Sequence, residues 1–184
     1  MPVLISMLRG VNLGPHIRIK MDALRALYES LKFEDPRSYV QSGNIIFRTK
    51  EKNGRQLATK IQGAIQKKFG CCPEVILRTP DEMRRAIAAN PFPERTKEEP
   101  GKVLVTFLAA DPRPEAEANL AKFKDFPEEL HLKGRELFIY FPNGAGKSKL
   151  PWSAVDKLLK VTGTARNWNS VHAMLEIAEE MERK

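Results

Sequence analysis

The sequence predicts an α+β protein made of two tandem ferredoxin-like subdomains, each an α/β plait, with extra helices at the C-terminus. Two observations carry this prediction. Short apolar runs, typical of strands, alternate along the chain with longer segments whose apolar side chains recur at helical spacing. The resulting order of elements, β-α-β-β-α-β, is that of the ferredoxin-like unit, and most of this order occurs twice.

The first half of the chain contains one complete unit. Asp35-Pro36 is expected to interrupt regular structure after the first helix. Gln41-Ser42-Gly43-Asn44 predicts a hairpin turn, or else a bulge inside one long strand. In chain order the predicted elements are a strand over Val3–Leu8, a helix over Met21–Leu31, strands over Ser38–Val40 and Asn44–Arg48, a helix over Leu57–Phe69 and a strand over Glu74–Leu77.

A capping sequence opens the connection between the two halves. In Thr79-Pro80-Asp81-Glu82, Thr79 and Glu82 can each accept the other's backbone N–H, and Pro80 suits the first helical turn. The helix is expected to end near Ala89, and Glu94–Gly101 is expected to be a loop or linker. We therefore expect an N-terminal subdomain over residues 1–78, a connecting helix and linker over 79–101, and a C-terminal subdomain with a helical extension over 102–184.

The second half repeats the pattern without its last strand. Helices on one face of each sheet would leave the other face for mutual packing or for a ligand. The predicted elements are a strand over Lys102–Leu108, a helix from Asp111-Pro112 to Phe123, strands over Leu130–Leu132 and Glu136–Phe141, a helix after Pro151 that carries Val155, Leu158 and Leu159, and a last helix that carries Val171, Met174, Leu175 and Ala178.

The net charge of +8 is concentrated in the first half. Residues 1–78 hold 14 Lys and Arg against 6 Asp and Glu, whereas residues 79–184 hold 17 of each. Such a bias favours anionic partners through attraction that salt screens beyond about 8 to 10 Å. A basic surface kept for solubility explains the same bias.

Composition also indicates where in the cell the protein is located. No apolar run approaches the roughly 20 residues that a bilayer span needs, and no cationic region precedes the first apolar run, so we expect a soluble, unexported protein with no membrane partner. Cys71 and Cys72 are adjacent, which is too close for a disulfide that would stabilise the fold, and they lack the spaced partners of a zinc site. A reducing cytoplasm fits best.

Four polar clusters interrupt or follow the apolar runs. They are Arg9-Gly10-Val11-Asn12, Gln41-Ser42-Gly43-Asn44, Gly144-Ala145-Gly146-Lys147-Ser148-Lys149 and Thr164-Ala165-Arg166-Asn167-Trp168-Asn169. Guanidinium groups and the unpaired backbone N–H groups at the N-terminus of a helix are typical anion-binding groups. The candidate ligand-binding residues are Arg9, Asn12, Gln41, Ser42, Asn44, Ser148, Lys149, Arg166 and Asn167.

Each cluster also has a purely structural interpretation. Asn and Gly are common in turns, which explains Gly43 and Asn44. The lysines of the third cluster can belong to a flexible, solvated turn. Asn169 can cap the last helix, and Trp168 can belong to the core.

Catalytic and cofactor signals are weak. His16, His131 and His172 are scattered, no nucleophile or metal ligand set is indicated, and no cofactor is expected. A phosphate-binding P-loop needs glycine five residues before Gly146, where this chain has Phe141. The first strand lacks the aromatic residues with which RNA-recognition domains stack bases, which disfavours sequence-selective RNA binding.

The chain resembles the uncharacterised, mainly bacterial family called domain of unknown function 1697. The resemblance implies a tandem pair of ferredoxin-like subdomains and no established activity. One departure is Gly14-Pro15, where the family usually carries a glycine pair. The matching motifs are Leu8-Arg9-Gly10-Val11-Asn12, Lys20-Met21, Tyr39-Val40-Gln41-Ser42-Gly43-Asn44-Ile45-Ile46-Phe47, Ser148-Lys149-Leu150 and Thr164-Ala165-Arg166-Asn167-Trp168-Asn169.

These observations favour a cytoplasmic protein that binds a phosphorylated or otherwise anionic small molecule, with nucleotides among the candidates, in a cleft between the two plaits. In one alternative, the same cleft belongs to a phosphate-ester hydrolase or transferase. In another, the chain is a nucleic-acid-binding or protein-interaction module that uses its basic half. The ligand, the oligomeric state and the physiological role stay open.

Overall fold

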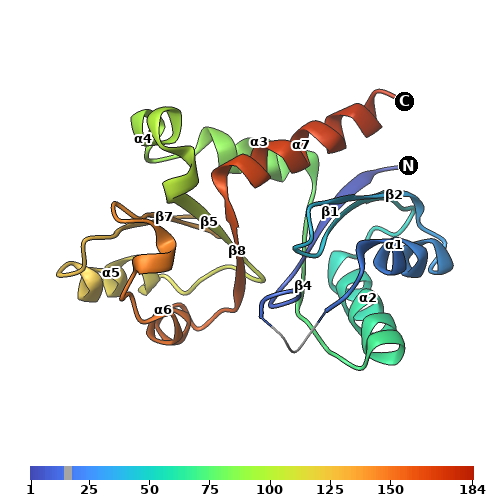
Figure 1. Cartoon of the computed structure of the whole chain (residues 1–184), viewed down its shortest axis with the longest axis horizontal. Coiled ribbons are helices and arrows are strands. Elements are labelled where there is room, and N and C mark those ends of the chain that lie inside the picture. The colour runs from blue at the N-terminus through green and yellow to red at the C-terminus, as the bar shows by residue number, and fades with distance from the viewer. Residues whose placement is uncertain (15–17) are drawn as a thin grey trace. The chain divides into compact units, whose positions relative to one another are not determined.

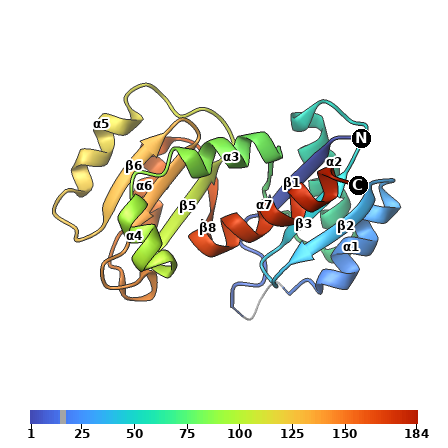
Figure 2. The ribbon, with the colours of Figure 1, turned by 90° about the horizontal axis from the view of Figure 1, so that it is seen from above.

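The chain folds into two compact units. The computed structural model describes residues 1–14 and 18–184, so His16 and the proline of Gly14-Pro15 lie outside the described residues. The first unit comprises Met1–Arg84 together with Ala173–Lys184, and the second comprises Arg85–His172. Figures 1 and 2 show the N-terminus and the C-terminus close together, both in the first unit.

The first unit contains a four-stranded antiparallel sheet with the strand order β2-β3-β1-β4. All six elements predicted for the first half are present. Its elements are β1 (Val3–Leu8), α1 (Met21–Ser30), β2 (Glu34–Tyr39), β3 (Asn44–Arg48), α2 (Gly54–Phe69) and β4 (Val75–Arg78).

One boundary in this sheet was predicted wrongly. Strand β2 begins at Glu34 and runs through Asp35-Pro36, whereas the sequence places its start at Ser38. β2 lies at the edge of the sheet, where proline costs no ladder hydrogen bond on the open side. Its pairing with β3 is irregular between Glu34 and Arg37, so proline and the positive φ of Asp35 fall within a bulge.

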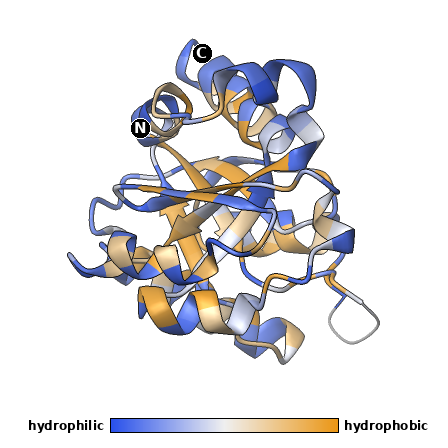
Figure 3. Ribbon diagram, turned by 90° about the vertical axis from the view of Figure 1, so that its left-hand side faces the viewer, coloured by the Kyte–Doolittle hydropathy of each residue, from blue (hydrophilic) through white to orange (hydrophobic). Residues whose placement is uncertain are grey.

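Helices α1 and α2 cover one face of this sheet. Alternate strand residues, among them Leu8, Ile45 and Phe47, form a buried cluster with Leu24 of α1 and Ile61 of α2. A helix with apolar residues at three- and four-residue intervals and a strand with period two can bury their apolar sides only in this way. Figure 3, which colours the chain by hydropathy, shows strand segments mostly in apolar colours and helices that carry both apolar and polar residues.

A buried hydrogen bond joins α1 to β1 within this core. The hydroxyls of Ser6 and Tyr28 lie 2.8 Å apart, and both residues are fully buried. Burial raises the pKa of Tyr28 well above its usual range, so the phenol stays protonated and able to donate.

We expect Tyr28→Phe to lower the free energy of unfolding by about 1 to 2 kcal/mol, because Ser6 would keep a buried hydroxyl without this partner. Urea unfolding of Tyr28→Phe, Ser6→Ala and the double variant measures the coupling. The double variant should cost less than the two single changes together. Strict additivity would show that the two hydroxyls do not interact.

The C-terminal part of α7 (Trp168–Glu182) belongs to the first unit. The side chain of Arg48 donates to the carbonyl of Met181, and Arg37 lies 3.6 Å from Glu180. From α3 (Pro80–Ala88), Arg84 contacts Glu179 at 2.9 Å and Glu182 at 2.6 Å. These ion pairs raise the pKa of Arg84.

The second face of the first sheet is closed. Ile5, Met7, Ile46 and Ile76 point to this face by register, opposite the side that α1 and α2 cover, and each is at most 2% exposed. The sequence left this face for mutual packing or for a ligand, and the choice between the two stays a prediction.

The predicted capping box of α3 is confirmed, since Thr79 N donates to Glu82 at 2.8 Å and Glu82 N donates to Thr79 Oγ1 at 3.1 Å.

The second unit contains a sheet of the same design, with the antiparallel strand order β6-β7-β5-β8. Its core joins strand residues such as Leu108, Leu137 and Ile139 to Val155 and Leu159 of α6 (Trp152–Leu159). The elements are α4 (Pro93–Glu98), the 3-10 turn η1 (Pro100–Lys102), β5 (Val103–Leu108), α5 (Ala116–Leu120), η2 (Ala121–Phe123), β6 (Glu129–Lys133), β7 (Glu136–Tyr140), η3 (Ala145–Lys147), α6 (Trp152–Leu159), β8 (Gly163–Asn167) and the start of α7.

Three segments of the second unit differ from the prediction. The helix expected from Asp111-Pro112 to Phe123 begins only at Ala116, as α5, and is followed by the turn η2. The charged stretch Glu94–Gly101 forms most of α4 and the turn η1, which begin at Pro93 and Pro100 respectively, because proline suits a first helical turn. Gly163–Asn167, predicted as an irregular cluster, is the fourth strand and pairs with β5. Gly163 allows this pairing, since a Cβ there would lie 2.7 Å from Thr106 Cγ2.

In the described part of the chain, no helix combines the length and the apolar character that crossing a membrane requires.

Candidate functional site

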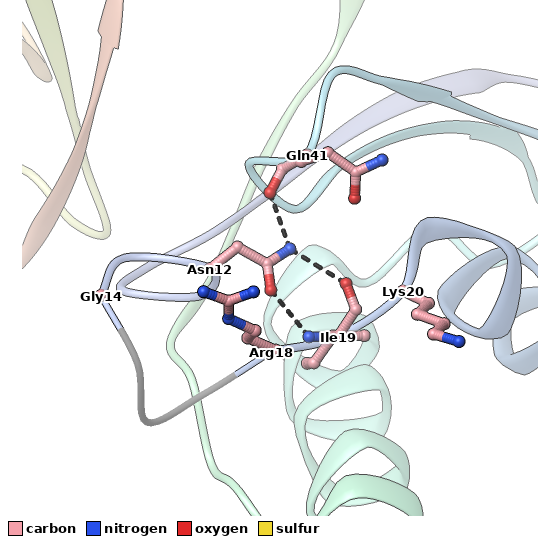
Figure 4. A pocket seen from close by; sticks show the side chains of 6 residues that line it. All are labelled: Asn12, Gly14, Arg18, Ile19, Lys20 and Gln41. Carbon is pink, nitrogen blue, oxygen red and sulfur yellow. Dashed lines mark hydrogen bonds between the residues drawn. The ribbon is translucent and has the colours of Figure 1, made fainter.

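The first unit has a hollow of about 670 Å³ beside the segment that follows β1. We call it the Asn12 hollow, and Figure 4 shows the side chains around it. One wall is the chain on either side of residues 15–17, and the other is the turn between β2 and β3. Its lining residues are Asn12, Gly14, Arg18, Ile19, Lys20 and Gln41.

The side chain of Asn12 ties these two walls together. Its Nδ2 donates to the carbonyls of Ile19 at 2.9 Å and Gln41 at 2.7 Å, and its Oδ1 accepts from the N–H of Ile19 at 2.7 Å. The two donors and one lone pair of the amide are therefore engaged with backbone groups. Asn12 itself has φ of +57°, a conformation that asparagine tolerates better than most residues. These hydrogen bonds give Asn12 a structural role, because they fix the shape of the hollow.

The turn between β2 and β3 packs closely on the end of β1. Leu8 N donates to the carbonyl of Gly43 at 3.0 Å, and a Cβ on Gly43 would lie 2.4 Å from Val11 Cγ2. Gly43 has φ of +74°, so glycine satisfies both the conformation and the close approach. Asn44 Nδ2 donates to Ser42 Oγ at 2.7 Å and to the carbonyl of Tyr39 at 3.3 Å, which holds the turn in shape.

Two exposed, positively charged side chains line the Asn12 hollow. Arg18 and Lys20 flank the buried Ile19, because alternate residues of an extended segment face opposite ways. Figure 4 shows the guanidinium of Arg18 beside Asn12 and the amine of Lys20 on the side of α1. Neither cation is among the residues proposed from the sequence, although the alternation of charged and apolar residues before a helix could have indicated them.

A second hollow of about 360 Å³ adjoins the first. We call it the Arg25 hollow. The side chain of Arg25 donates to Ser38 Oγ and to the carboxylate of Asp22, so its guanidinium is held against α1 and β2. The two hollows share Lys20 and Gln41. The lining residues are Lys20, Met21, Asp22, Arg25, Ser38, Val40 and Gln41.

Five of the site residues predicted from the sequence belong to the first unit. Asn12, Gln41, Ser42 and Asn44 lie around the β2–β3 turn, and Gln41 alone of these lines both hollows. Arg9 is half-buried where β1 ends, and its backbone N–H donates to the carbonyl of Glu74 at 2.9 Å.

The other four predicted residues belong to the second unit. Ser148 Oγ accepts from Leu150 N at 3.0 Å, which shapes a turn, and Lys149 is exposed. Asn167 Oδ1 accepts from Ser170 N at 2.8 Å, so Asn167 caps α7, and the suggested cap at Asn169 is wrong. The common cleft expected for both groups stays a prediction.

Arg166 is a buried cation on β8. It is 8% exposed, and its Nη1 donates to Thr164 Oγ1 at 2.7 Å and to the carbonyl of Ala165 at 2.8 Å. Burial lowers the pKa of the guanidinium to about 10, so it remains charged at neutral pH. These contacts with its own strand hold the guanidinium in place.

Metal and thiol chemistry find little support in the described residues. Within residues 1–14 and 18–184, no three His, Cys, Asp or Glu side chains are grouped as metal ligands would be. Cys71 and Cys72 are free thiols, and burial raises the pKa of Cys71, which reduces the thiolate that a nucleophile needs.

The fold defines an α+β protein with two four-stranded antiparallel sheets of equivalent strand order, of which the first carries two adjoining cationic hollows. The chain belongs to the family of proteins of unknown function DUF1697, whose profile matches residues 1–138. The resemblance to this family is thereby confirmed, through a match that covers the motifs before residue 138.

A conserved bacterial protein from Streptococcus pneumoniae has a similar structure. The TM-score is 0.72 at 17% sequence identity, over 96% of this chain and 98% of that one. At this identity the similarity concerns the fold alone. Among curated proteins, none matches this chain.

Proposed function

We propose that this protein binds a phosphorylated or otherwise anionic small molecule in the Asn12 hollow of its first unit. The observation that carries the proposal is the pair of exposed cations, Arg18 and Lys20, at a hollow of about 670 Å³ whose walls Asn12 holds together. Hollows of about 300 to 1,000 Å³ are typical of small-molecule sites.

The chemistry of the lining residues supports an anion. Arg18 offers a planar set of donors that matches phosphate, and Lys20 offers a mobile point charge. The amide of Gln41 adds a donor and an acceptor that can orient a neutral part of the ligand. The charge of the first half, 14 Lys and Arg against 6 Asp and Glu in residues 1–78, would attract the anion from a distance.

We also propose that each unit is a ferredoxin-like plait. The order of elements in each, β-α-β-β-α-β, and the central position of β1 and β3 in one sheet and of β5 and β7 in the other support this assignment. The free thiols of Cys71 and Cys72 support a cytoplasmic location, where thiols stay reduced.

Isothermal calorimetry with a panel of phosphorylated metabolites tests the function. We expect at least one compound to bind the wild type, and Arg18→Gln and Lys20→Gln each to weaken that binding about tenfold, because charge-assisted hydrogen bonds contribute about 1.5 to 3 kcal/mol. The matched control is Lys149→Gln, an exposed lysine of the second unit. It should leave the affinity unchanged.

The remaining outcomes separate the alternatives. Equal weakening by Lys149→Gln would favour a site that includes the second unit, as the sequence suggests. Tight, strongly salt-dependent binding of a random oligonucleotide, unaffected by Arg18→Gln, would favour the nucleic-acid module. Failure of every compound to bind would refute the proposed function.

A further inference from the structure

We propose that the ligand carries two separate anionic groups, one bound by Arg18 in the Asn12 hollow and the other by Arg25 in the Arg25 hollow. Sugar bisphosphates and nucleoside bisphosphates have this chemistry. The inference rests on the proposed function and specifies the ligand class of the same site.

The two hollows adjoin. Lys20 and Gln41 line both, so a ligand in the Asn12 hollow can extend past these two residues toward the Arg25 hollow. Arg18 lines only the Asn12 hollow and Arg25 only the Arg25 hollow, so each hollow has a guanidinium group of its own. Lys20 lines both hollows and can contact an anionic group in either one; Figure 4 shows its amine on the side of α1.

The size of the two hollows allows a ligand larger than a single small anion. A water molecule occupies about 30 Å³ in the liquid, and a phosphate group displaces only a few waters. The hollows measure about 670 and 360 Å³, so an inorganic phosphate would leave most of the space to solvent. An organic molecule that carries two phosphate groups would occupy both the Asn12 hollow and the Arg25 hollow.

The guanidinium of Arg25 is oriented and accessible, as anion binding requires. Two of its five N–H donors engage Ser38 Oγ and Asp22, which orients the guanidinium and leaves donors for a ligand. Its side chain is 34% exposed and therefore accessible from the hollow. The hydroxyl of Ser38, in the same lining, can turn to donate to a phosphate oxygen.

Asp22 does not cancel this charge. Its side chain is 89% exposed, and a solvated ion pair of this kind contributes little stability. The Arg25 hollow contains two cations, Lys20 and Arg25, against the one carboxylate of Asp22. A dianionic phosphate can thus compete with Asp22 for the guanidinium, whereas a neutral group could not.

The test compares matched ligands that differ by one phosphate. Calorimetry would use adenosine 5′-monophosphate against adenosine 3′,5′-bisphosphate, and fructose 6-phosphate against fructose 1,6-bisphosphate. In the pair that binds, we expect the bisphosphate to bind at least tenfold more tightly. Arg25→Gln should remove that advantage and leave the monophosphate affinity within twofold, whereas Arg18→Gln should weaken both.

Arg113→Gln, which removes an exposed arginine from the second unit, is the control for net charge and should change neither affinity. Equal affinities for the two members of a pair, or a bisphosphate preference that survives Arg25→Gln, would overturn the two-anion inference while the proposed function stands. Absence of binding by all four compounds and by the wider panel would refute both.

Discussion

Gly43→Ala is expected to destabilise the protein by about 3 kcal/mol. The new methyl group would lie 2.4 Å from Val11 Cγ2 and 2.9 Å from Leu8 Cβ, and Leu8 belongs to a buried strand that cannot shift locally. Overpacking of this kind costs about 1 to 3 kcal/mol. The φ of +74° adds about 1 to 2 kcal/mol for a residue with a Cβ. Urea unfolding followed by circular dichroism measures the loss.

Two other glycines serve as controls for this change. Gly10 has φ of +71° with no atom within 4 Å of its would-be Cβ, so Gly10→Ala should show the conformational cost alone. Gly63 lies in α2 with open space around it, and Gly63→Ala should stabilise the helix by about 0.5 to 1 kcal/mol. If Gly43→Ala cost no more than Gly10→Ala, the close contact with β1 would be disproved.

Asn12→Asp is expected to destabilise the first unit by about 3 kcal/mol and to weaken ligand binding at least tenfold. The replacement has the same shape, but its carboxylate cannot donate to the carbonyls of Ile19 and Gln41, which lie 2.9 and 2.7 Å from Nδ2. Two hydrogen bonds worth about 1 kcal/mol each would be exchanged for repulsion between oxygens. Urea unfolding and calorimetry with the ligand of the wild type measure the two effects.

The pH dependence gives an internal check on this prediction. The facing carbonyls would raise the folded-state pKa of the introduced carboxyl above its unfolded value of about 3.9. Its protonated form is then favoured by folding, so the deficit should shrink as the pH falls below the raised pKa and return as the pH rises. Asn143→Asp, at an exposed loop residue of the second unit, is the control and should show neither effect. A deficit independent of pH would argue against the tie that Asn12 makes.

Local patterns predicted most elements because their causes are local. The capping box of Thr79 and Glu82 needs only residues three apart, and its two hydrogen bonds are present. The apolar spacing of α2 likewise specifies which side of the helix is buried, and Leu57, Ile61 and Ile65 are all fully buried. Two of the polar clusters chosen from the sequence, the one after β1 and the β2–β3 turn, are joined by the hydrogen bond from Asn12 to the carbonyl of Gln41.

The errors concern segments whose structure depends on distant partners. Gly163–Asn167 is polar and short, and it becomes a strand only because β5 supplies its hydrogen-bond partners. In the same way, β2 includes Asp35-Pro36 because an edge strand tolerates a bulge. Periodicity carries no information about such pairing, since it records only which side of an element is buried.

The candidate site shows the same limit. Asn12 and Gln41 were chosen from the sequence as ligand groups, yet the structure uses the amide of Asn12 to join backbone segments, while Gln41 faces two hollows. Arg18 and Lys20 become candidate ligand-binding residues only because the fold places them in the lining of the Asn12 hollow. A hollow has no sequence signature, because its lining comes from separate segments of the chain.

The sequence by itself determined the α+β class, the family, the order of most strands and helices and the basic character of the first half. Only the tertiary structure decided that Ala173–Lys184 joins the first unit, that Gly163–Asn167 completes the second sheet and that two hollows adjoin at Lys20 and Gln41. The physical reason is that propensity and apolar spacing act between near neighbours, whereas strand pairing, ion pairs and cavities arise where residues remote in sequence are packed together.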